Sequence, residues 1–297
     1  MAPFLSVIIP TYNRAEKLEK CLHALREQSL ASESFEVLVV DDGSTDSTPK
    51  VLERWAKDWN NIKHLHQENA GQGNARNKAL RQAQGQVILF IGDDIYGSPD
   101  FLLKHTEFHR EHPEKEFACL GLTEWDPSQE ITPFMEWLTH GGPQFAYHHL
   151  KPMEEVSFWY FYTSNISIKK DLLEKESFDP DFKVYGWEDI ELGYRLSQRG
   201  MKLMYKPEAL AHHDHFMSED SLKDRAFKIG KSAVLFQKKQ PAVPVLPSGL
   251  KKSVLTVLSS KPILALSFLL KTIFPPLKKM HWFLINKHYF LQGIRSI

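Results

Sequence analysis

The chain has 297 residues, of which 42% are hydrophobic and 25% are charged, and it contains 15 Gly, 17 Pro and 2 Cys. This composition excludes a collagen-like or wholly disordered chain, and two cysteines are too few for a disulfide framework. The length fits one large α/β domain or two smaller ones. The first residues lack the basic segment and cleavage site of a signal peptide, so we expect a cytoplasmic protein.

The formal net charge of zero conceals an asymmetry along the chain. Residues 1–224 contain all 37 Asp and Glu but only 24 Lys and Arg, which gives them a net charge of −13. Residues 225–297 carry the other 13 basic side chains and no acid, a net charge of +13. Two physically different bodies are therefore expected in one chain.

The first hundred residues alternate between predicted strands and helices. Apolar runs predict strands at 5–10, 35–40 and 86–91, with a weaker strand at 62–66. Helical spacing of apolar residues predicts helices over 15–28, 48–59 and 71–83. This alternation predicts an α/β fold with a Rossmann-like, mainly parallel sheet flanked by helices.

The alternation stops after Pro99, and three regions are expected. Residues 1–100 form a half whose layout fits a nucleotide-type ligand, and residues 101–220, richer in aromatic residues and His, form a half suited to shape a substrate pocket. Residues 221–297 form a basic, apolar, helical tail.

Polar residues follow the carboxyl ends of three predicted strands, the edge where open α/β sheets bind ligands. They are Thr11 to Arg14, the pair Asp41 and Asp42, and the pair Asp93 and Asp94. Adjacent carboxylates repel each other unless a cation lies beside them, so Asp93 and Asp94 fit a divalent-metal site. Taken alone, this pair fits a helix cap equally well, and Asp41–Asp42 fits a turn.

Two further segments carry candidate chemistry. The loop 69–77 enters a helix, so its backbone N–H groups and Arg76 could face a phosphate, although Gly-x-Gly alone fits a flexible loop better. The stretch 186–196 begins a helix with Glu188 and Asp189 in its first turn, which is by itself a well-made helix start. A tryptophan beside two carboxylates also suits a sugar that stacks on Trp187 while a carboxylate accepts its hydroxyl proton.

A histidine cluster follows the strand-like run 203–211. It comprises His212, His213 and His215, and a neutral imidazole there could complete a metal site with an aspartate. Taken alone, the cluster fits a solvated loop better.

Together and in this order, SVIIPTYNR, VVDDGSTD, NAGQGNARNKAL, FIGDDI, GWEDIELGYRL and AHHDH resemble glycosyltransferase family 2, the inverting transferases of the GT-A type. The resemblance covers residues 5 to about 216. It implies a GT-A fold, a nucleotide-sugar donor, a divalent metal, Mn²⁺ or Mg²⁺, and action at the cytosolic face.

The resemblance also implies roles for single residues. Those that match the donor-nucleotide site are Pro10, Thr11, Tyr12, Arg14, Asp42, Arg76 and Asp93, with Asp42 on uracil and Asp93 on the ribose. Asp94 matches the metal ligand, although Ile91 and Gly92 stand where many members have Asp and Ser.

The remaining implied roles lie in the second half. Asp189 matches the catalytic base, Glu188 its neighbour that helps hold the acceptor, and Trp187 is assigned to the acceptor. His213 matches the late metal-binding histidine, with His215 and His212 as alternates.

The resemblance therefore implies a metal-dependent enzyme that transfers a sugar from a UDP-sugar to a hydroxyl of a glycan or lipid-linked glycan. Such an enzyme would act in cell-surface polysaccharide biosynthesis. A polyprenyl-phosphate sugar synthase would use a phosphate acceptor and would not need Asp189. A nucleotidyltransferase would carry a Gly-rich, basic N-terminal loop that residues 10–14 do not resemble. A membrane-bound nucleotide-binding protein without catalysis is the alternative from another class.

Residues 225–297 are expected to contact an anionic membrane on its inner face. Their longest uncharged apolar stretch, Pro262 to Leu270, is far shorter than the roughly 20 residues that span a bilayer. Helices lying in the headgroup plane fit better. A helical cap or a homo-oligomer interface remains open, and the Leu and Phe content argues against nucleic-acid binding.

Overall fold

The computed structural model describes residues 2–297, which form two compact units. Unit 1 comprises the chain up to Glu130 together with Tyr147–Lys183 and Asp189–His215. Unit 2 comprises Ile131–Ala146, Val184–Glu188 and Phe216–Ile297. The division at residues 100 and 220, which rests on the end of the strand–helix alternation and on the change in composition, stays a prediction.

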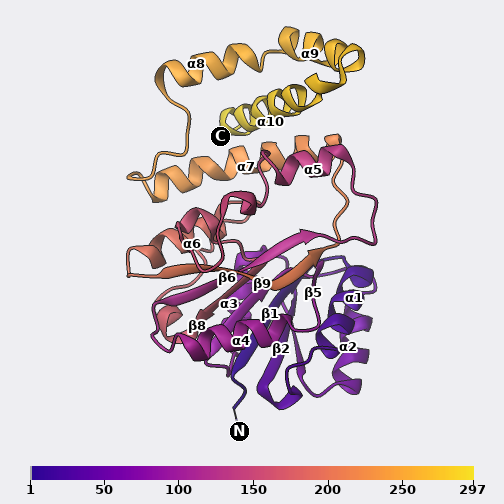
Figure 1. The fold of residues 1–297 in the computed structure, drawn as a ribbon, viewed down its shortest axis with the longest axis vertical. Coiled ribbons are helices and arrows are strands. Elements are labelled where there is room, and N and C mark those ends of the chain that lie inside the picture. The colour runs from indigo at the N-terminus through magenta and orange to yellow at the C-terminus, as the bar shows by residue number, and fades with distance from the viewer. Residues whose placement is uncertain (1) are drawn as a thin grey trace. The chain divides into compact units, whose positions relative to one another are not determined.

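Unit 1 is built on one sheet, which has nine strands in the described part of the chain (Figure 1). Their order is β3-β2-β1-β4-β8-β6-β9-β5, and β7 pairs with β9. The strands are β1 (Leu5–Thr11), β2 (Phe35–Asp41), β3 (Ile62–His66), β4 (Val87–Ile91), β5 (Ile95–Gly97), β6 (Phe117–Trp125), β7 (Glu155–Val156), β8 (Asn165–Lys169) and β9 (Lys202–His213).

The N-terminal half of the sheet is parallel, as the alternation of strands and helices predicts. β1 pairs with β2 and β4, and β2 with β3, all in parallel. Beyond β4 the sheet is mixed, because β8 runs antiparallel to both β4 and β6. β5 and β7 also run antiparallel to β9, whereas β6 and β9 are parallel.

Helices cover both faces of this sheet. α1 (Ala15–Arg26), α2 (Thr48–Asp58) and α4 (Phe101–Glu111) share one apolar core with alternate residues of β1, β2 and β4, such as Val7 and Leu89. Strand side chains alternate between faces, so Phe90 points the other way, where it packs edge-on against Phe178 at 5.4 Å. α3 (Gln72–Leu80) contacts β1 and β2, and its buried Ala75 and Ala79 lie outside the first core.

A bulge in β9 accommodates Pro207, which has no N–H to donate to a ladder. Lys206 pairs with Gly121 and Leu210 with Leu122, so the three residues between them face no partner on β6. Beyond the bulge the strand continues along β5, where His213 lies opposite Ile95. This register brings the end of β9 beside the turn that holds Asp93 and Asp94.

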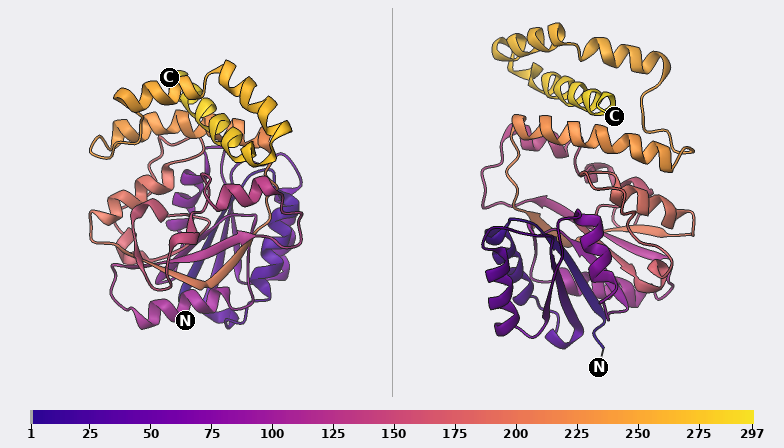
Figure 2. Two further views of the ribbon diagram at one scale, coloured as in Figure 1. Left: turned by 45° about the horizontal axis from the view of Figure 1, so that its top comes forward. Right: turned by 180° about the vertical axis from the view of Figure 1, so that it is seen from behind.

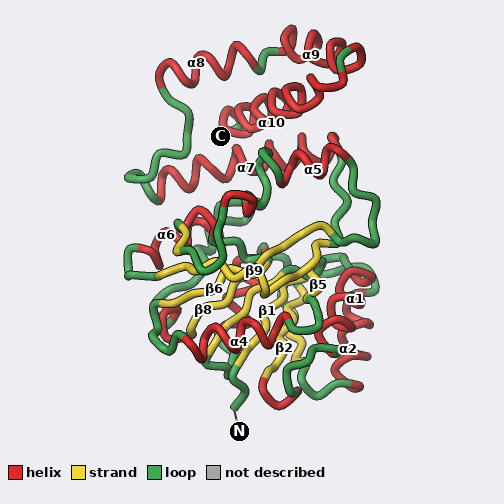
Figure 3. Tube along the Cα trace, in the orientation of Figure 1, coloured by secondary structure: helices red, strands yellow, loops and turns green. Residues whose placement is uncertain are grey.

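Unit 2 consists of helices and loops in the part of the chain that the structure describes (Figure 3). Its helices are α5 (Pro133–Thr139), α7 (Glu219–Lys239), α8 (Gly249–Leu258), α9 (Lys261–Ile273) and α10 (Lys278–Arg295). α6 (Glu188–Ser197) begins at the last residue of a unit 2 segment and otherwise belongs to unit 1.

Short 3₁₀ helices lie at Ser32–Ser34, Tyr147–His149, Phe158–Tyr160, Lys170–Leu173 and Pro275–Leu277.

α7 and α10 run side by side and meet at two glycines (Figure 2). A Cβ added to Gly230 would lie 2.1 Å from the Phe290 carbonyl oxygen, and one added to Gly293 would lie 2.0 Å from that of Phe227. Both distances are far shorter than a van der Waals contact, so this crossing requires glycine on both helices.

Among residues 2–297, none of the helices taken singly has the length and apolar character to cross a bilayer. Only α8 and α9 counted together meet that test, and the pair is bent by 54°.

Candidate active site

Three segments of unit 1 meet at Asp93 and Asp94, directly after the buried strand β4. Both aspartates are buried. The Thr11 hydroxyl, at the end of β1, donates to Asp93 Oδ2 at 2.7 Å. Arg14 Nη1 lies 2.5 Å from Asp94 Oδ2 and 3.4 Å from Asp93 Oδ1. The structure thus joins four of the predicted donor-site and metal residues by direct contacts.

Two histidines approach the same carboxylate from the end of β9. His213 Nε2 lies 3.4 Å and His215 Nδ1 3.2 Å from Asp94 Oδ2. One ligand atom from each of the three side chains falls within 4.8 Å of the others, a spacing that one metal ion can bridge. One carboxylate and two imidazoles form a donor set that fits a divalent transition metal. His212, the other alternate, lies on the opposite face of the strand from His213.

The two aspartates have opposite electrostatics. Burial opposes ionisation of Asp94, but His213, His215 and Arg14 outweigh it and hold the pKa of this carboxyl well below its usual range. Burial, together with the neighbouring charge on Asp94, raises the pKa of Asp93 to about 7. Asp94 is therefore the anionic member of the pair and the one suited to bind a cation.

Asp214, between the two histidines, anchors the end of β9 to α1 and β5. Its carboxylate lies 2.7 Å from Lys17 Nζ and 3.0 Å from Lys20 Nζ, and it accepts a 2.8 Å hydrogen bond from the Tyr96 hydroxyl. Its N–H donates to the Asp94 carbonyl oxygen at 2.9 Å. Burial opposes ionisation, but Lys17, Tyr96 and Lys20 lower its pKa to about 2. Sequence reasoning missed this role, since only the fold brings α1 beside the end of β9.

Trp125 and Gln129 also hold His213. The Trp125 indole stacks on the imidazole with a centroid distance of 5.3 Å and an interplanar angle of 12°. Gln129 Nε2 donates to the His213 carbonyl oxygen at 2.9 Å. Neither residue was predicted, because no local pattern links them to a histidine more than eighty positions away.

Asp42 joins two loops that the sequence treats as separate motifs. Its carboxylate accepts hydrogen bonds from Gln67 Nε2 at 2.7 Å and from the N–H groups of Ala70 and Gly71, both at 2.9 Å. Its own N–H donates to the Thr11 carbonyl oxygen at 2.9 Å. The described contacts of Asp42 therefore fix the loop that enters α3, and its contact with uracil stays a prediction.

Asn13 connects the β1 and β2 loops. It adopts a left-handed conformation with a φ of 53°, which asparagine tolerates better than most residues. Its Oδ1 accepts from the N–H groups of Thr45 at 2.7 Å and Asp46 at 3.3 Å. Beside it, Pro10 is buried and Tyr12 is 46% exposed. Asn13 was predicted only as a member of the segment Thr11 to Arg14, with no role of its own.

Arg76 is buried, whereas an arginine in a flexible loop would be exposed to solvent. Its guanidinium lies 5.4 Å from the centroid of the Phe178 ring, and it is 3% exposed. The next residue, Asn77, exchanges two hydrogen bonds with the backbone of Phe178 at 2.7 and 2.9 Å. α3 and the segment around Phe178 therefore form one packed element, and the role of Arg76 near the diphosphate stays a prediction.

The predicted acid pair begins α6. Asp189 Oδ1 accepts from the Ile190 N–H at 2.8 Å, and its side chain is half-buried. Glu188 is buried, and its carboxylate accepts from the Gly186 N–H at 3.1 Å. Further along the helix, Arg195 binds Glu191 at 2.8 Å and also pairs with Glu176. Asp189 is thus the more accessible carboxylate of the predicted pair.

Trp187 is held by α7. It has a φ of 73°, and its indole N–H donates to the Ile229 carbonyl oxygen at 3.0 Å. Its ring lies 5.0 Å from that of Phe236. These contacts give Trp187 a packing role within unit 2, and stacking on a sugar stays a prediction.

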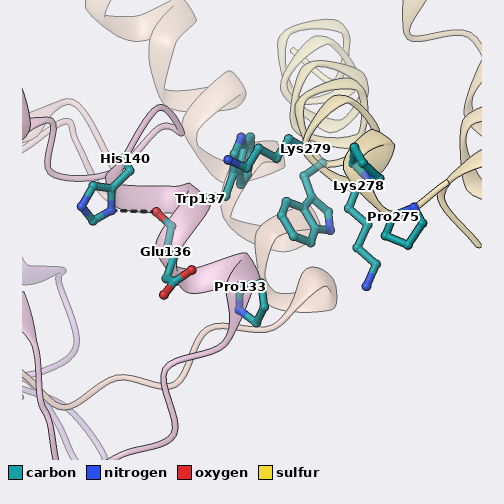
Figure 4. A pocket seen from close by; sticks show the side chains of 9 residues that line it. Pro133, Glu136, Trp137, His140, Pro275, Lys278 and Lys279 are labelled. Atoms are coloured by element: carbon teal, nitrogen blue, oxygen red, sulfur yellow. Dashed lines mark hydrogen bonds between the residues drawn. The ribbon is translucent and has the colours of Figure 1, made fainter.

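A separate pocket of about 370 Å³ lies in unit 2 (Figure 4). The residues that line it are Pro133, Glu136, Trp137, His140, Pro275, Pro276, Lys278, Lys279 and Trp282. None of the predicted donor, metal or catalytic residues is among them.

Residues 6–175 match the family model described as Glycosyl transferase family 2. Validoxylamine A glucosyltransferase from Streptomyces hygroscopicus subsp. jinggangensis is 34% identical over 230 residues, which cover 70% of this chain and 54% of that protein. The poly(ribitol-phosphate) beta-N-acetylglucosaminyltransferase TarS of Staphylococcus aureus is 38% identical over 108 residues, 36% of this chain and 19% of that protein. The chain spans about half the length of the validoxylamine A glucosyltransferases that it matches.

Solved structures share the fold at low sequence identity. The mannosyltransferase PcManGT of Pyrobaculum calidifontis, in complex with GDP-Man and Mn²⁺, aligns with a TM-score of 0.68 at 19% identity. That alignment covers 99% of this chain and 88% of the neighbour. Residues 1–349 of S. aureus TarS in complex with UDP align with a TM-score of 0.58 at 19% identity, over 98% of this chain and 90% of that one. The predicted GT-A fold is confirmed.

Proposed function

The chain belongs to glycosyl transferase family 2, and from this premise we propose that it is a metal-dependent inverting glycosyltransferase. It moves a sugar from a nucleotide sugar to a hydroxyl of a glycan or lipid-linked glycan. The observation that carries the proposal is the convergence of Asp94, His213 and His215 on one point beside Asp93.

The metal site follows from these three side chains. Asp94 supplies an anionic oxygen, and two imidazoles complete the set. These side chains would hold a Mn²⁺ or Mg²⁺ ion, which would offset the negative charge that develops on a nucleoside diphosphate leaving group. Asp214 keeps the two histidines in place through its contacts with α1 and Tyr96.

The donor nucleotide binds at the edge where β1, β2 and β4 end. Tyr12 offers an exposed ring for the base, and Asp93, held by Thr11 and Arg14, is the carboxylate for the ribose. Asp42 and Arg76 complete this side. UDP is the proposed nucleotide, and support comes from TarS, whose structure was solved with UDP. The neighbour solved with GDP-Man makes a GDP-sugar the competing donor.

Asp189 is the proposed general base. The acceptor hydroxyl oxygen forms a bond to the anomeric carbon as the bond to the diphosphate oxygen breaks, and the hydroxyl proton passes to Asp189. A single displacement inverts the anomeric centre. Glu188, the first residue of α6, and Trp187, which directly precedes that helix, hold the acceptor.

The proposed acceptor is a cell-surface polysaccharide, and the sequence similarity to TarS, which is named for a poly(ribitol-phosphate) acceptor, supports this class. A polyprenyl-phosphate acceptor is the second candidate, and it would make Asp189 dispensable because a phosphate is already ionised.

The test has two stages. Calorimetry with UDP- and GDP-sugars in the presence of Mn²⁺ identifies the donor, and mass analysis of mixtures with lipid-linked glycans identifies the product. We expect one donor class to bind and one sugar to be added to a hydroxyl. Tight nucleotide binding with neither transfer nor donor hydrolysis would indicate a binding protein without catalysis.

A further inference from the structure

We propose that α8 and α9 form a docking surface for an anionic lipid membrane, on which unit 2 lies without crossing the bilayer. This surface comprises the outward side chains of α8 and α9 and the lysines beside them. The inference goes beyond the proposed function and depends on none of the residues assigned to it.

Apolar side chains of α8 share one face and are open to water. Leu250, Val254 and Val257 follow the spacing i, i+4, i+7, which places them on one side of a helix. Their exposed fractions run from 46% to 80%. In a water-soluble helix this face would be the buried one.

α9 carries an exposed apolar face of its own. Leu266, Leu269 and Ile273 follow the spacing i, i+3, i+7, and each is more than half exposed. The opposite side of the helix holds Ser267, whose hydroxyl is 2.7 Å from His281 Nδ1 on α10. The apolar face therefore points outward because α9 uses its polar serine to pack inward. Exposed apolar residues gathered on helix faces in this way indicate an interaction site.

Charge indicates which partner fits. Lys251, Lys252 and Lys261 flank the apolar residues of α8 and α9, and all three are exposed. Lys278 and Lys279 follow at the start of α10, and residues 225–297 contain no acid. Each basic residue near an anionic lipid surface contributes about 1 kcal/mol. A second copy of this chain would bring the same positive charge to the interface and repel it.

The helices have the dimensions of an interfacial rather than a spanning element. α9 has 13 residues and α8 has 10, against roughly 20 for a transmembrane helix. The 54° bend between them interrupts a straight crossing. Short amphipathic helices with lysines beside an apolar face lie in the headgroup plane.

The inner side of α9 is tied to the rest of unit 2, so its outer face can be changed by itself. Lys271 Nζ lies 2.7 Å from Glu219 Oε2, and the Trp282 indole N–H donates to Glu219 Oε1 at 2.8 Å. Neither contact involves Leu266, Leu269 or Ile273.

The experiment is co-sedimentation of the full chain with lipid vesicles. One set contains phosphatidylcholine alone, and the other contains phosphatidylcholine with phosphatidylglycerol. We expect binding to the anionic vesicles at low salt that weakens as salt is raised. Combined Leu266→Ser, Leu269→Ser and Ile273→Ser should reduce binding more than tenfold. Lys251→Ala with Lys252→Ala and Lys261→Ala should remove the preference for anionic lipid.

Ile131→Ser, at an exposed apolar residue of unit 2 outside α8 and α9, is the matched control and should bind as the unchanged chain does. No binding of the unchanged chain to anionic vesicles, or full binding by the serine variant, overturns the proposal. Light scattering without lipid tests the alternative occupant, a second copy of this chain. If the unchanged chain has the mass of a dimer and the serine variant has the mass of a monomer, the surface is a dimer interface and the membrane proposal is overturned.

A second readout does not depend on the serine variant folding. Cys21 and Cys119 are buried, so a cysteine introduced by Leu269→Cys can be labelled selectively with a polarity-sensitive fluorophore. We expect a blue shift of its emission on addition of anionic vesicles. An unchanged spectrum while the chain co-sediments would place the contact elsewhere and overturn the proposal.

Discussion

Unit 1 and the C-terminal part of unit 2 place charged and apolar residues in opposite ways. In unit 1 the apolar residues are inside, and carboxylates such as Asp93, Asp94 and Asp214 are buried and paired with basic side chains. In α8 and α9, Lys251, Lys252 and Lys261 are exposed, and apolar residues are exposed beside them. Buried charges that are paired with each other suit a site for chemistry. Exposed charges beside apolar residues suit a surface that positions the protein at a membrane.

The largest expected effect is a loss of the proposed activity of unit 1 without a loss of membrane binding. Asp189→Asn removes the proposed base, and we expect transfer to fall by about 10³-fold or more. Donor affinity, measured by calorimetry, should stay within a few-fold, and vesicle binding should be unchanged. Turnover like that of the unchanged enzyme would refute the assignment of the base.

Removal of the metal tests the same unit at another point. Excess EDTA should stop transfer, and added Mn²⁺ or Mg²⁺ should restore it. Asp94→Ala should weaken donor binding by about 10 to 100-fold, more than His215→Ala does, because it removes the anionic ligand. Full activity in EDTA would contradict the metal site.

A third prediction disrupts unit 2 through its interior. Gly230→Val places side-chain atoms where α7 and α10 touch, and we expect a loss of about 1–3 kcal/mol in the free energy of unfolding. Gly249→Asn is the control, because its φ is 52° and nothing lies within 4 Å of an added Cβ. Urea unfolding measures both. Equal stability of the two variants would contradict the close crossing.

The smallest expected effect concerns the anchor of the histidines. The pKa of Asp214 is lowered to about 2, so its ionised form stabilises the fold above the unfolded-state pKa of about 3.9, and this stabilisation disappears as the pH falls toward 2. Asp214→Asn should cost about 1–2 kcal/mol at pH 7, since Lys17 and Lys20 are partly exposed and water weakens their pairing.

Urea unfolding at pH 7, 4 and 3 follows this difference, which should shrink between pH 4 and 3. A difference that stays constant with pH would show that the carboxylate charge is not what stabilises the segment.

Much of the fold and part of the site could be predicted from the sequence. Strands β1, β2 and β4 are short apolar runs with polar residues at their ends, and each such signal is local. The convergence of Asp94 with His213 and His215 followed from a resemblance that orders distant motifs.

The antiparallel strands, the anchoring of Asp214 and the packing of Trp187 on α7 could not be predicted. Each depends on which distant segment returns beside which. Asp214 meets Lys17 because β9 passes Pro207 in a bulge and then runs along β5, and no local pattern encodes that path.

The chain, as described from residue 2 onward, passes between the two units five times, and one passage falls between Glu188 and Asp189. A ribosome releases Trp187 well before Ile229, which accepts its N–H, and α7 meets its glycine partner only when Gly293 has emerged. The turn before the proposed base is therefore among the last parts to mature during synthesis. Truncation before Gly293 would remove the helix that packs on α7, and α7 carries the Ile229 carbonyl that holds Trp187.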